Sequence, residues 1–471
     1  MKIGFWFDYD QTYTFTYVFN ELIKLNPNLA ATGFVINDRY YDFASKNLHK
    51  KSNLVSFYNL LNQAKRHDPS NNAIKRFNHY DEKYGLTKVM YSDRWLKKLN
   101  SKLGFEGIIN VFANLIEYFE EYIKQEKLDA FVFNCVASAW SHLFYYVLKE
   151  HEIKVMIPTA TGIDNRFFIA DNPYEYIKEA YEYFKRLNLG LVEAEDIIRE
   201  EAKKVIKKIR NFTPAYENKA IDLEKEKFKF PSIKKAFSYL NNYIRFYKND
   251  YTQSSPLERA VNLVVYRINK FLNNRMYKKI SEIDKSFVYY PLHYEPEIAN
   301  LILSQYHQHS IIDIIVKQIP MNWLLVLKEH PAMVNQRNYK FFKEILERYP
   351  NVIVINPSEN SLELVKKSEL VFSLCGTVIL ESIILKKPVV YTGKSKYEGF
   401  GLGICSKDIL NFENLIKEAK IIKYNEHEIE NMIISIIKFS YDFIFAEPLG
   451  RPEVLNPENI SKIARALYDK L

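Results

Sequence analysis

Three short polar segments in the second half of the sequence carry residue types that bind phosphate groups. His293 to Glu297 supplies a histidine and two carboxylates in a backbone that neighbouring prolines restrict. Lys328 to Pro331 offers a positive charge and an imidazole, both of which suit a phosphate. Ser373 to Thr377 combines hydroxyl groups with Gly376, which lets the backbone approach a ligand closely. Together these residue types predict a nucleotide site.

The third segment precedes a predicted helix, VILESIILKK, whose first N–H groups could also face a phosphate. Thr377 would donate to that phosphate or simply cap the helix. Glu381 lies one turn inside the helix, where it would bind ribose hydroxyls or remain an exposed acid. The other two segments also have ordinary explanations, a solvated turn for His293 to Glu297 and a structural histidine for His330. Their recurrence at successive strand ends favours a binding site.

The elements that position these segments form a regular alternation that begins near Ser286. Five apolar strands alternate with helices over about 110 residues, which predicts a doubly wound parallel sheet. Ligands of such sheets bind beyond the carboxyl ends of the strands, where the three polar segments lie. The predicted strands are FVYYPL, WLLVL, NVIVIN, LVFSL and PVVYTG.

The first part of the chain shows the same alternation and predicts a second Rossmann-like domain. Its strands are KIGFWF, GFVIN, AFVFN and KVMIP. Strands disappear between about residues 172 and 284, so we expect a helical insertion there that covers the first domain. The predicted divisions are 1–171 for the first Rossmann-like domain, 172–284 for the insertion and linker, 285–445 for the second Rossmann-like domain, and 446–471 for a connector and helix.

Bulk properties indicate a multi-domain globular protein of the cytoplasm. At 471 residues the chain exceeds one ordinary core, and its 47% hydrophobic and 26% charged residues are typical of soluble proteins. It contains no apolar run of roughly 18 residues, and Asp8 comes too early for a secretory signal. Its three cysteines lie far apart, which predicts neither a disulfide framework nor a metal site.

Residues 225–284 are strongly basic and aromatic. They hold 13 Lys and Arg against 5 Asp and Glu, with 11 Phe and Tyr. This composition fits a helix that lies on an anionic membrane surface, or a helix whose aromatic face packs on the core while its lysines are solvated. Nucleic-acid binding is disfavoured because the chain lacks a recognisable nucleic-acid motif.

The segments FVYYPLHYEPE, LKEHP, NPSENS and SLCGTVILESIILKKPVVYTG resemble those of capsule and surface-polysaccharide biosynthesis proteins. That group includes Kdo transferases that use CMP-Kdo, and the segments are also similar to the HP and Ser/Thr motifs of bacterial sialyltransferases. The resemblance covers roughly Phe287 to Gly393. It implies a GT-B fold, in which two Rossmann-like domains face a cleft, with the donor on the carboxyl-terminal domain and the acceptor on the amino-terminal one.

The resemblance places the HP motif on His330 and Pro331. It places the phosphate-binding motif on Ser373, Gly376 and Thr377, and the glutamate of the following helix on Glu381. Lys328, His293 and Glu295 fall in the matching segments and are expected at the nucleotide-sugar site. The resemblance also implies no metal and no cofactor besides the donor. The run Asp8-Tyr9-Asp10 looks like the metal-binding DxD motif of the other glycosyltransferase fold, but it follows the first strand of the chain, so the likeness is interpreted as accidental with respect to metal.

The catalytic group should come from the first domain, at strand ends that face the donor. The candidates are Asp8 and Asp10 after the first strand, and Asp164 and Arg166 in the loop TATGIDNR. A carboxylate could deprotonate an acceptor hydroxyl or attack the anomeric carbon, and Arg166 suits an acidic sugar. All four could equally be ordinary loop residues.

These observations predict a glycosyltransferase that moves a sugar, such as a Kdo-like sugar carried by CMP, to a surface glycan or lipid-linked acceptor. We expect it in the cytoplasm or peripherally on the inner face of the cell membrane. Two alternatives remain open: a hydrolysing sugar-nucleotide 2-epimerase of the same fold, and a protein of polysaccharide assembly without catalytic activity.

Overall fold

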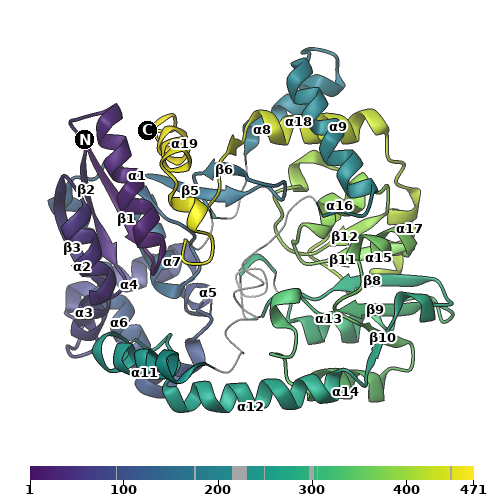
Figure 1. Cartoon of the computed structure of the whole chain (residues 1–471), viewed down its shortest axis with the longest axis horizontal. Coiled ribbons are helices and arrows are strands. Elements are labelled where there is room, and N and C mark those ends of the chain that lie inside the picture. Colours follow the sequence, from purple (N-terminus) through teal and green to yellow (C-terminus); the bar gives the residue numbers. More distant parts are fainter. Residues whose placement is uncertain are drawn as a thin grey trace.

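The computed structural model describes residues 1–91, 93–173, 177–214, 231–248, 250–295, 302–304, 306–445 and 448–471. Within these ranges the chain forms two α/β domains side by side, each built on a seven-stranded sheet (Figure 1). The predicted GT-B architecture, a pair of Rossmann-like domains with a helical insertion, is thereby confirmed. Every strand predicted from the sequence is present, and each sheet also contains strands that the sequence did not predict.

The first sheet has the strand order β14-β6-β5-β4-β1-β2-β3. The five strands from β5 to β3 are parallel, whereas β6 and β14 are antiparallel to their neighbours. The bounds are β1 Lys2–Phe7, β2 Ala30–Val35, β3 Lys51–Ser56, β4 Ala130–Val132, β5 Lys154–Ala160, β6 Arg166–Ala170 and β14 Tyr441–Asp442. The strand β1 lies near the centre of the sheet, and its apolar sequence is buried from Ile3 to Phe7.

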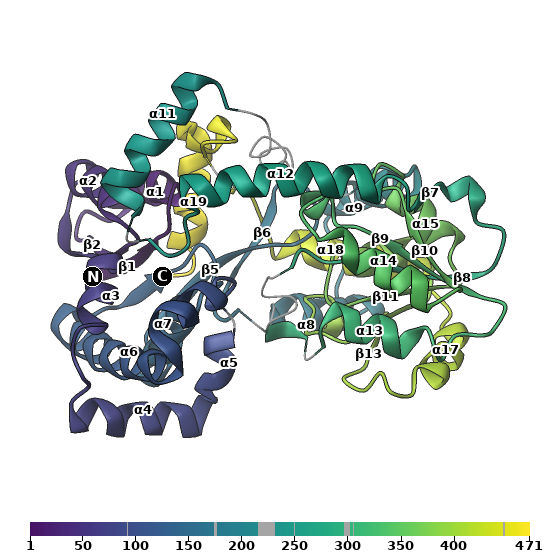
Figure 2. The same cartoon turned by 90° about the horizontal axis from the view of Figure 1, so that it is seen from below.

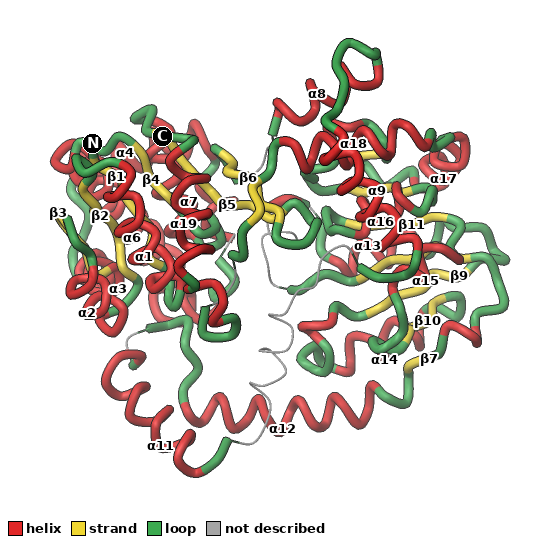
Figure 3. The backbone as a smooth tube through the Cα atoms, turned by 45° about the horizontal axis from the view of Figure 1, so that its top comes forward, coloured by secondary structure: helices red, strands yellow, loops and turns green. Residues whose placement is uncertain are grey.

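Helices flank both faces of this sheet, as crossover connections between parallel strands require (Figure 3). They are α1 Gln11–Leu25, α2 Asp38–Asn47, α3 Phe57–Ala64, α4 Asn71–Tyr84, α5 Leu86–Tyr91, α6 Leu96–Glu126 and α7 Ala139–Glu150. The long helix α6 breaks at Gly104, whose φ of 66° only glycine adopts readily.

The second sheet is entirely parallel and has the order β13-β12-β11-β8-β9-β10-β7. Its strands are β7 Tyr277–Lys278, β8 Phe287–Pro291, β9 Leu324–Lys328, β10 Val352–Ile355, β11 Leu370–Ser373, β12 Val389–Tyr391 and β13 Ile404–Cys405. The covering helices are α13 Gln308–Ile315, α14 Tyr339–Arg348, α15 Ser361–Lys367, α16 Val378–Ile384, α17 Phe412–Ile421 and α18 Glu426–Lys438. The carboxyl ends of β8, β9 and β11 carry the three polar segments.

Two helices of the insertion pack on the second domain, not on the first as the sequence suggested. The helices α8 Lys178–Asn188 and α9 Asp196–Arg210 lie against α18 (Figure 1). Phe184 and Ile206 on their apolar faces join the core around Tyr289 of β8. Amphipathic helices bury their apolar face wherever a partner surface is available, and sequence periodicity does not identify that partner.

The end of the chain returns to the first domain. The helix α19 Pro457–Tyr468 packs on α1, and its Ile463 and Leu467 share a core with Phe15 and Phe19. The strand β14 completes the same sheet beside β6. Consequently, the first domain is assembled from both ends of the sequence (Figure 1).

Helices α11 Ile233–Asn242 and α12 Pro256–Asn273 lie along one side of the molecule (Figures 1 and 2). The helix α12 spans both domains. Lys98 of the first domain forms an ion pair of 3.1 Å with Glu258 in its first turn. Near its other end, the side chain of Asn269 donates to the Asn335 carbonyl of the second domain at 3.1 Å. In the described part of the chain, no helix is both long and apolar enough to cross a membrane.

Candidate functional site

A pocket of about 860 Å³ lies where the two domains meet. Asp8 and Asp10 follow β1, and Asn134 lies just beyond β4, so the carboxyl edge of the first sheet forms one wall. The second domain contributes Tyr294, which lies beyond β8. Six of the aromatic side chains in the lining are Tyr9, Tyr58, Trp95, Trp140, Tyr251 and Tyr294. An aromatic-lined pocket with a few polar groups has the character of a small-molecule site.

Asp8 has the electrostatic properties of a proton acceptor. Burial, reinforced by the nearby charge of Asp10, raises the pKa of Asp8 to about 6. A hydrogen bond from the Asn134 side chain and the charge of Arg94 act in the opposite direction. A carboxylate with a pKa near neutrality is ionised at pH 7 yet holds a proton more strongly than an ordinary aspartate. Asp8 therefore suits general base catalysis.

The turn that carries Asp8 and Asp10 has a strained backbone. Tyr9 has a φ of 41°, a backbone angle that residues other than glycine rarely adopt. Its hydroxyl donates to a carboxylate oxygen of Asp250 at 3.0 Å and also contacts Thr252, in the segment that leads into α12. Asp10 is the N-cap residue of α1, but its side chain makes no capping hydrogen bond. The turn therefore presents both carboxylates at the pocket.

Asp164 and Arg166 do not line this pocket. Arg166 donates to both carboxylate oxygens of Glu201 in α9, each at 2.6 Å. Asp164 forms an ion pair with Lys208 of the same helix. These two residues instead connect β6 of the first domain with a helix of the second. Of the four catalytic candidates from the sequence, the structure brings only Asp8 and Asp10 to the pocket.

In the second domain, His293 holds the Ser373 to Gly376 loop in place. Its Nε2 lies 3.3 Å from both the Oγ of Ser373 and the backbone N of Leu374. Burial and the neighbouring His330 lower the pKa of His293 to about 3, so the ring is neutral and accepts the Leu374 N–H. A Cβ on Gly376 would lie 3.1 Å from the His293 ring, which explains the glycine at this position. His293 thus acts as a support for the loop.

Glu295 belongs to a buried charge network centred on Arg337. The Arg337 guanidinium donates to Glu295 at 2.8 Å and to Glu329 at 2.8 Å. It also donates to the carbonyl of His293 at 3.2 Å. The Glu329 side chain is only 1% exposed, so its charge depends on this partner. The network fixes the loops after β8 and β9 relative to each other.

Lys328 and Glu381 form an electrostatic pair at the same sheet edge. Burial lowers the pKa of Lys328 to about 8, although the charges of Glu381 and Glu359 oppose that shift. Desolvation raises the pKa of Glu381 to about 7, and the Lys328 charge opposes it. The Lys328 ammonium also donates to the Oγ of Ser361 at 2.7 Å. Both side chains can therefore gain or lose a proton close to neutral pH.

The HP pair faces the boundary between the domains. The Nδ1 of His330 accepts the Ala332 N–H at 3.2 Å, and Pro331 starts the short turn that follows. Burial and the charges of Lys328 and Arg337 lower the pKa of His330 to about 4, so the neutral ring keeps its proton on Nε2. The ring lies 6.0 Å from that of Tyr294, over which Arg94 of the first domain is placed at 5.9 Å. These contacts connect the HP pair with the pocket.

The loop between β5 and β6 reaches the second domain beside Thr377. A Cβ on Gly162, whose φ is 90°, would lie 3.2 Å from the Thr377 methyl group and collide with the Tyr397 hydroxyl. That hydroxyl donates to the carbonyl of Thr161 at 2.7 Å. Thr377 is the N-cap residue of α16 but makes no side-chain capping bond. Its hydroxyl is therefore not used in the capping role that the sequence also allowed.

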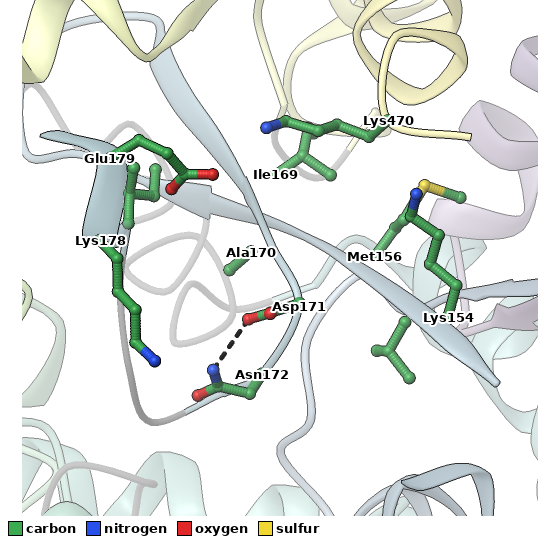
Figure 4. Close-up of a pocket in the computed structure, with 11 residues that line it drawn as sticks. Lys154, Met156, Ile169, Ala170, Asp171, Asn172, Lys178, Glu179 and Lys470 are labelled. Carbon is green, nitrogen blue, oxygen red and sulfur yellow. Dashed lines mark hydrogen bonds between the residues drawn. The ribbon is translucent and has the colours of Figure 1, made fainter. Parts of the chain in front are cut away.

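A second pocket of about 300 Å³ opens at the opposite edge of the first sheet (Figure 4). Lys154 at the start of β5, Asp171 beyond β6 and Lys470 beyond α19 contribute to its lining. None of the predicted site residues lines it. The pocket between the domains is thus the candidate that agrees with the carboxyl-edge rule for parallel sheets.

Several residues of the larger pocket escaped the sequence-based prediction. Asn134 follows a predicted strand, so the strand-end rule could have identified it. Arg94 precedes α6, and Arg259 lies on α12, which sequence periodicity cannot place at a sheet edge. Among the residues described, no three His, Cys, Asp or Glu side chains are grouped as ligands for a metal ion.

Comparison with known proteins gives a family model and several distant structures. Residues 259–442 match a model described as a protein of unknown function, DUF354. No curated protein matches the sequence. The Thermosulfurimonas dismutans KpsC beta Kdo 2,4 transferase is similar with 14% identity and a TM-score of 0.40, over 73% of this chain and 88% of that one.

Two other solved structures are similar at comparable distance. Anabaena HepE, solved with UDP and glucose, has 10% identity and a TM-score of 0.30, with 100% of each chain covered. The Methanocaldococcus jannaschii UDP-GlcNAc 2-epimerase, solved with UDP-GlcNAc and UDP, has 13% identity and a TM-score of 0.30, over 93% of this chain and 100% of that one. Because these TM-scores are low, the fold is assigned from the two sheets of this chain and not from its similarity to these structures.

Proposed function

We propose that the protein is a glycosyltransferase that moves a sugar from a nucleotide-activated donor to a glycan or lipid-linked acceptor. The observation that carries the proposal is Asp8, a carboxylate with a pKa near 6 in a large aromatic pocket between two Rossmann-like domains. Aromatic rings pack well on the apolar faces of sugars, and polar side chains between them bind hydroxyl groups. Such a pocket suits an acceptor sugar.

The donor would lie on the carboxyl edge of the second sheet. The Ser373 to Gly376 loop, fixed by His293, offers hydroxyl and backbone N–H groups to a nucleotide phosphate. Lys328 adds a positive charge, and the neutral His330 can donate from Nε2. The resemblance to Kdo transferases makes a CMP-linked acidic sugar the favoured donor class. Arg94 and Arg259, which line the pocket, take the role that the sequence gave to Arg166 and can bind an acidic group.

In the proposed reaction Asp8 acts as the general base. It accepts the proton of an acceptor hydroxyl while the oxygen of that hydroxyl forms a bond to the anomeric carbon. The bond between this carbon and the phosphate oxygen breaks, and its electron pair leaves with the nucleotide phosphate. Asp10 contributes by its charge, which helps to keep the pKa of Asp8 high. Product is released as the glycosylated acceptor and the nucleotide.

Two aspartate variants test whether Asp8, and not the other sequence-predicted candidate Asp164, is the catalytic base. Asp8→Asn should reduce sugar transfer by about 10²- to 10⁴-fold, the usual contribution of a general base. Affinity for CMP or UDP, measured by calorimetry, should stay unchanged because the donor half is intact. Asp164→Asn is the matched control and should retain transfer, since Asp164 pairs with Lys208 away from the pocket. Full transfer by Asp8→Asn, or no binding of any nucleotide, would contradict the proposal.

A hydrolysing 2-epimerase is the second candidate, and Glu381 favours it. A carboxyl with a pKa near 7 beside Lys328 can move a proton on the donor side of the site. Incubation of the protein with a sugar nucleotide and no acceptor distinguishes the two functions by NMR. Free epimerised sugar, lost in Glu381→Gln, would favour the epimerase. Unchanged donor, consumed only when a glycan acceptor is added, would favour transfer.

A further inference from the structure

Helices α11 and α12 expose an unusual amount of apolar surface. In α11 no residue is buried, and Ile233, Phe237, Leu240 and the following Ile244 recur at the spacing of one helix face. In α12 a second apolar face points to solvent, formed by Leu257, Val261, Val264, Val265, Ile268 and Phe271. These ten side chains are between 40% and 78% exposed. Exposed apolar side chains gathered on one face of a helix commonly mark an interaction site.

The two faces belong to neighbouring helices on one side of the molecule (Figures 1 and 2). Arg259 of α12 lies 4.4 Å above the ring of Tyr239 in α11, and the Tyr239 hydroxyl donates to the Ser254 carbonyl just before α12. The opposite face of α12 is occupied by contacts with the protein, including Leu263 and Asn269. These contacts join α11 to the beginning of α12, and the apolar faces of both helices stay accessible.

The charges around this surface specify its partner. Lys234, Lys235, Arg245, Lys248, Arg267 and Lys270 are all exposed on the same segment. Of the two acidic residues in 231–275, Asp250 is 4% exposed, whereas the half-exposed Glu258 forms an ion pair with Lys98. An exposed apolar face with flanking cations matches the headgroup and acyl boundary of an anionic bilayer.

We propose that α11 and α12 form a docking surface for anionic membranes, in which the apolar faces enter the lipid boundary and the flanking cations contact the headgroups. This inference goes beyond the proposed function and does not depend on it. The surface lies along the side of the molecule where α12 joins the domains, and Arg259 on α12 also lines the pocket. Docking by this face would place the pocket close to the membrane surface.

The test is flotation of the full chain with vesicles of phosphatidylcholine alone or with added phosphatidylglycerol. The protein should bind the anionic vesicles and bind them less at high salt. The triple variant Lys234→Gln, Lys235→Gln, Lys270→Gln should lower binding by about 100-fold, since each cation contributes roughly fivefold. The triple variant Phe237→Ser, Ile244→Ser, Ile268→Ser should also release the protein.

Matched controls come from equally exposed residues elsewhere. Leu189→Ser, Leu410→Ser, Ile421→Ser and, separately, Lys124→Gln, Lys366→Gln, Lys423→Gln should leave vesicle binding unchanged. Unchanged melting by circular dichroism checks that each variant is folded. Equal binding by all variants would overturn the proposal. It would also be overturned if light scattering shows a dimer that the apolar variant converts to a monomer, because a second copy of the chain would then cover this surface.

Discussion

Asp8 combines catalytic suitability with a cost to the stability of the folded protein. Its carboxyl is surrounded by protein and lies near Asp10, so the ionised form is less favourable in the fold than in the unfolded chain. The folded pKa of about 6 lies above the 3.8 of an ordinary aspartate. Stability is therefore greatest below the unfolded pKa and declines as pH rises through the folded pKa. Functional sites commonly hold such unfavourable charges.

Asp8→Asn should consequently raise the melting temperature at pH 7.5 while it lowers the rate of transfer. The increase in melting temperature should become smaller as pH falls from 6 to below 4, because the wild-type carboxyl is then protonated in both the folded and the unfolded protein. Differential scanning calorimetry at pH 4 and pH 7.5 measures the difference. In parallel, the transfer rate of the wild type should fall below pH 6. A lower melting temperature for Asp8→Asn at pH 7.5 would contradict this account.

His293 was predicted at the donor site, and in the structure it contacts the loop to which the proposed function assigns the donor phosphate. Its ring accepts a backbone N–H of the loop after β11, so its contribution is to hold that loop. His293→Ala should weaken CMP or UDP binding by at least about tenfold, which corresponds to the loss of roughly one buried hydrogen bond. His309→Ala, an exposed histidine of the same domain, serves as control. Calorimetric titration of both variants decides the point.

At the scale of elements, the buried ion network between the loops after β8 and β9 contributes to the stability of the fold. Arg337→Leu would leave the Glu329 carboxylate, which is 1% exposed, without its ion-pair partner. Loss of one member of such a pair typically costs about 3–5 kcal/mol. Urea denaturation should show this decrease in the free energy of unfolding. Lys343→Ala breaks an exposed pair with Glu347 in the same domain and should change stability by no more than about 0.5 kcal/mol.

The strands near the centre of each sheet could be predicted because they are apolar runs between turn signals. The edge strand β3, KSNLVS, was not predicted because four of its six residues are polar, and β7, β13 and β14 were not predicted because two residues show no period. The strand β6, RFFIA, was not predicted because it directly follows the loop TATGIDN. Strand ends then located Asp8, Asp10 and the second-domain loops. Arg94, Arg259 and Arg337 come from loops and helices, whose positions depend on tertiary packing that no local pattern records.

For the whole molecule, each domain depends on segments that lie outside its continuous sequence. Helices α8 and α9 complete the core of the second domain, and α19 completes that of the first. A fragment of residues 1–171 should therefore fail to fold, because the apolar face of α1 would be exposed to water. Addition of residues 440–471 through a flexible linker should restore cooperative thermal unfolding, measured by circular dichroism. Cooperative unfolding of the unmodified fragment would refute this dependence.

The return of α19 to α1 also has a consequence for synthesis. About 290 residues separate the end of β6 from the start of α19. At roughly 5–20 residues per second, the ribosome needs roughly 15–60 s to make them. During that interval the first domain has all its parallel strands but lacks the helix that covers Phe15 and Phe19. The domain that emerges first therefore finishes folding last, and a chaperone that shields α1 would increase the yield of native protein.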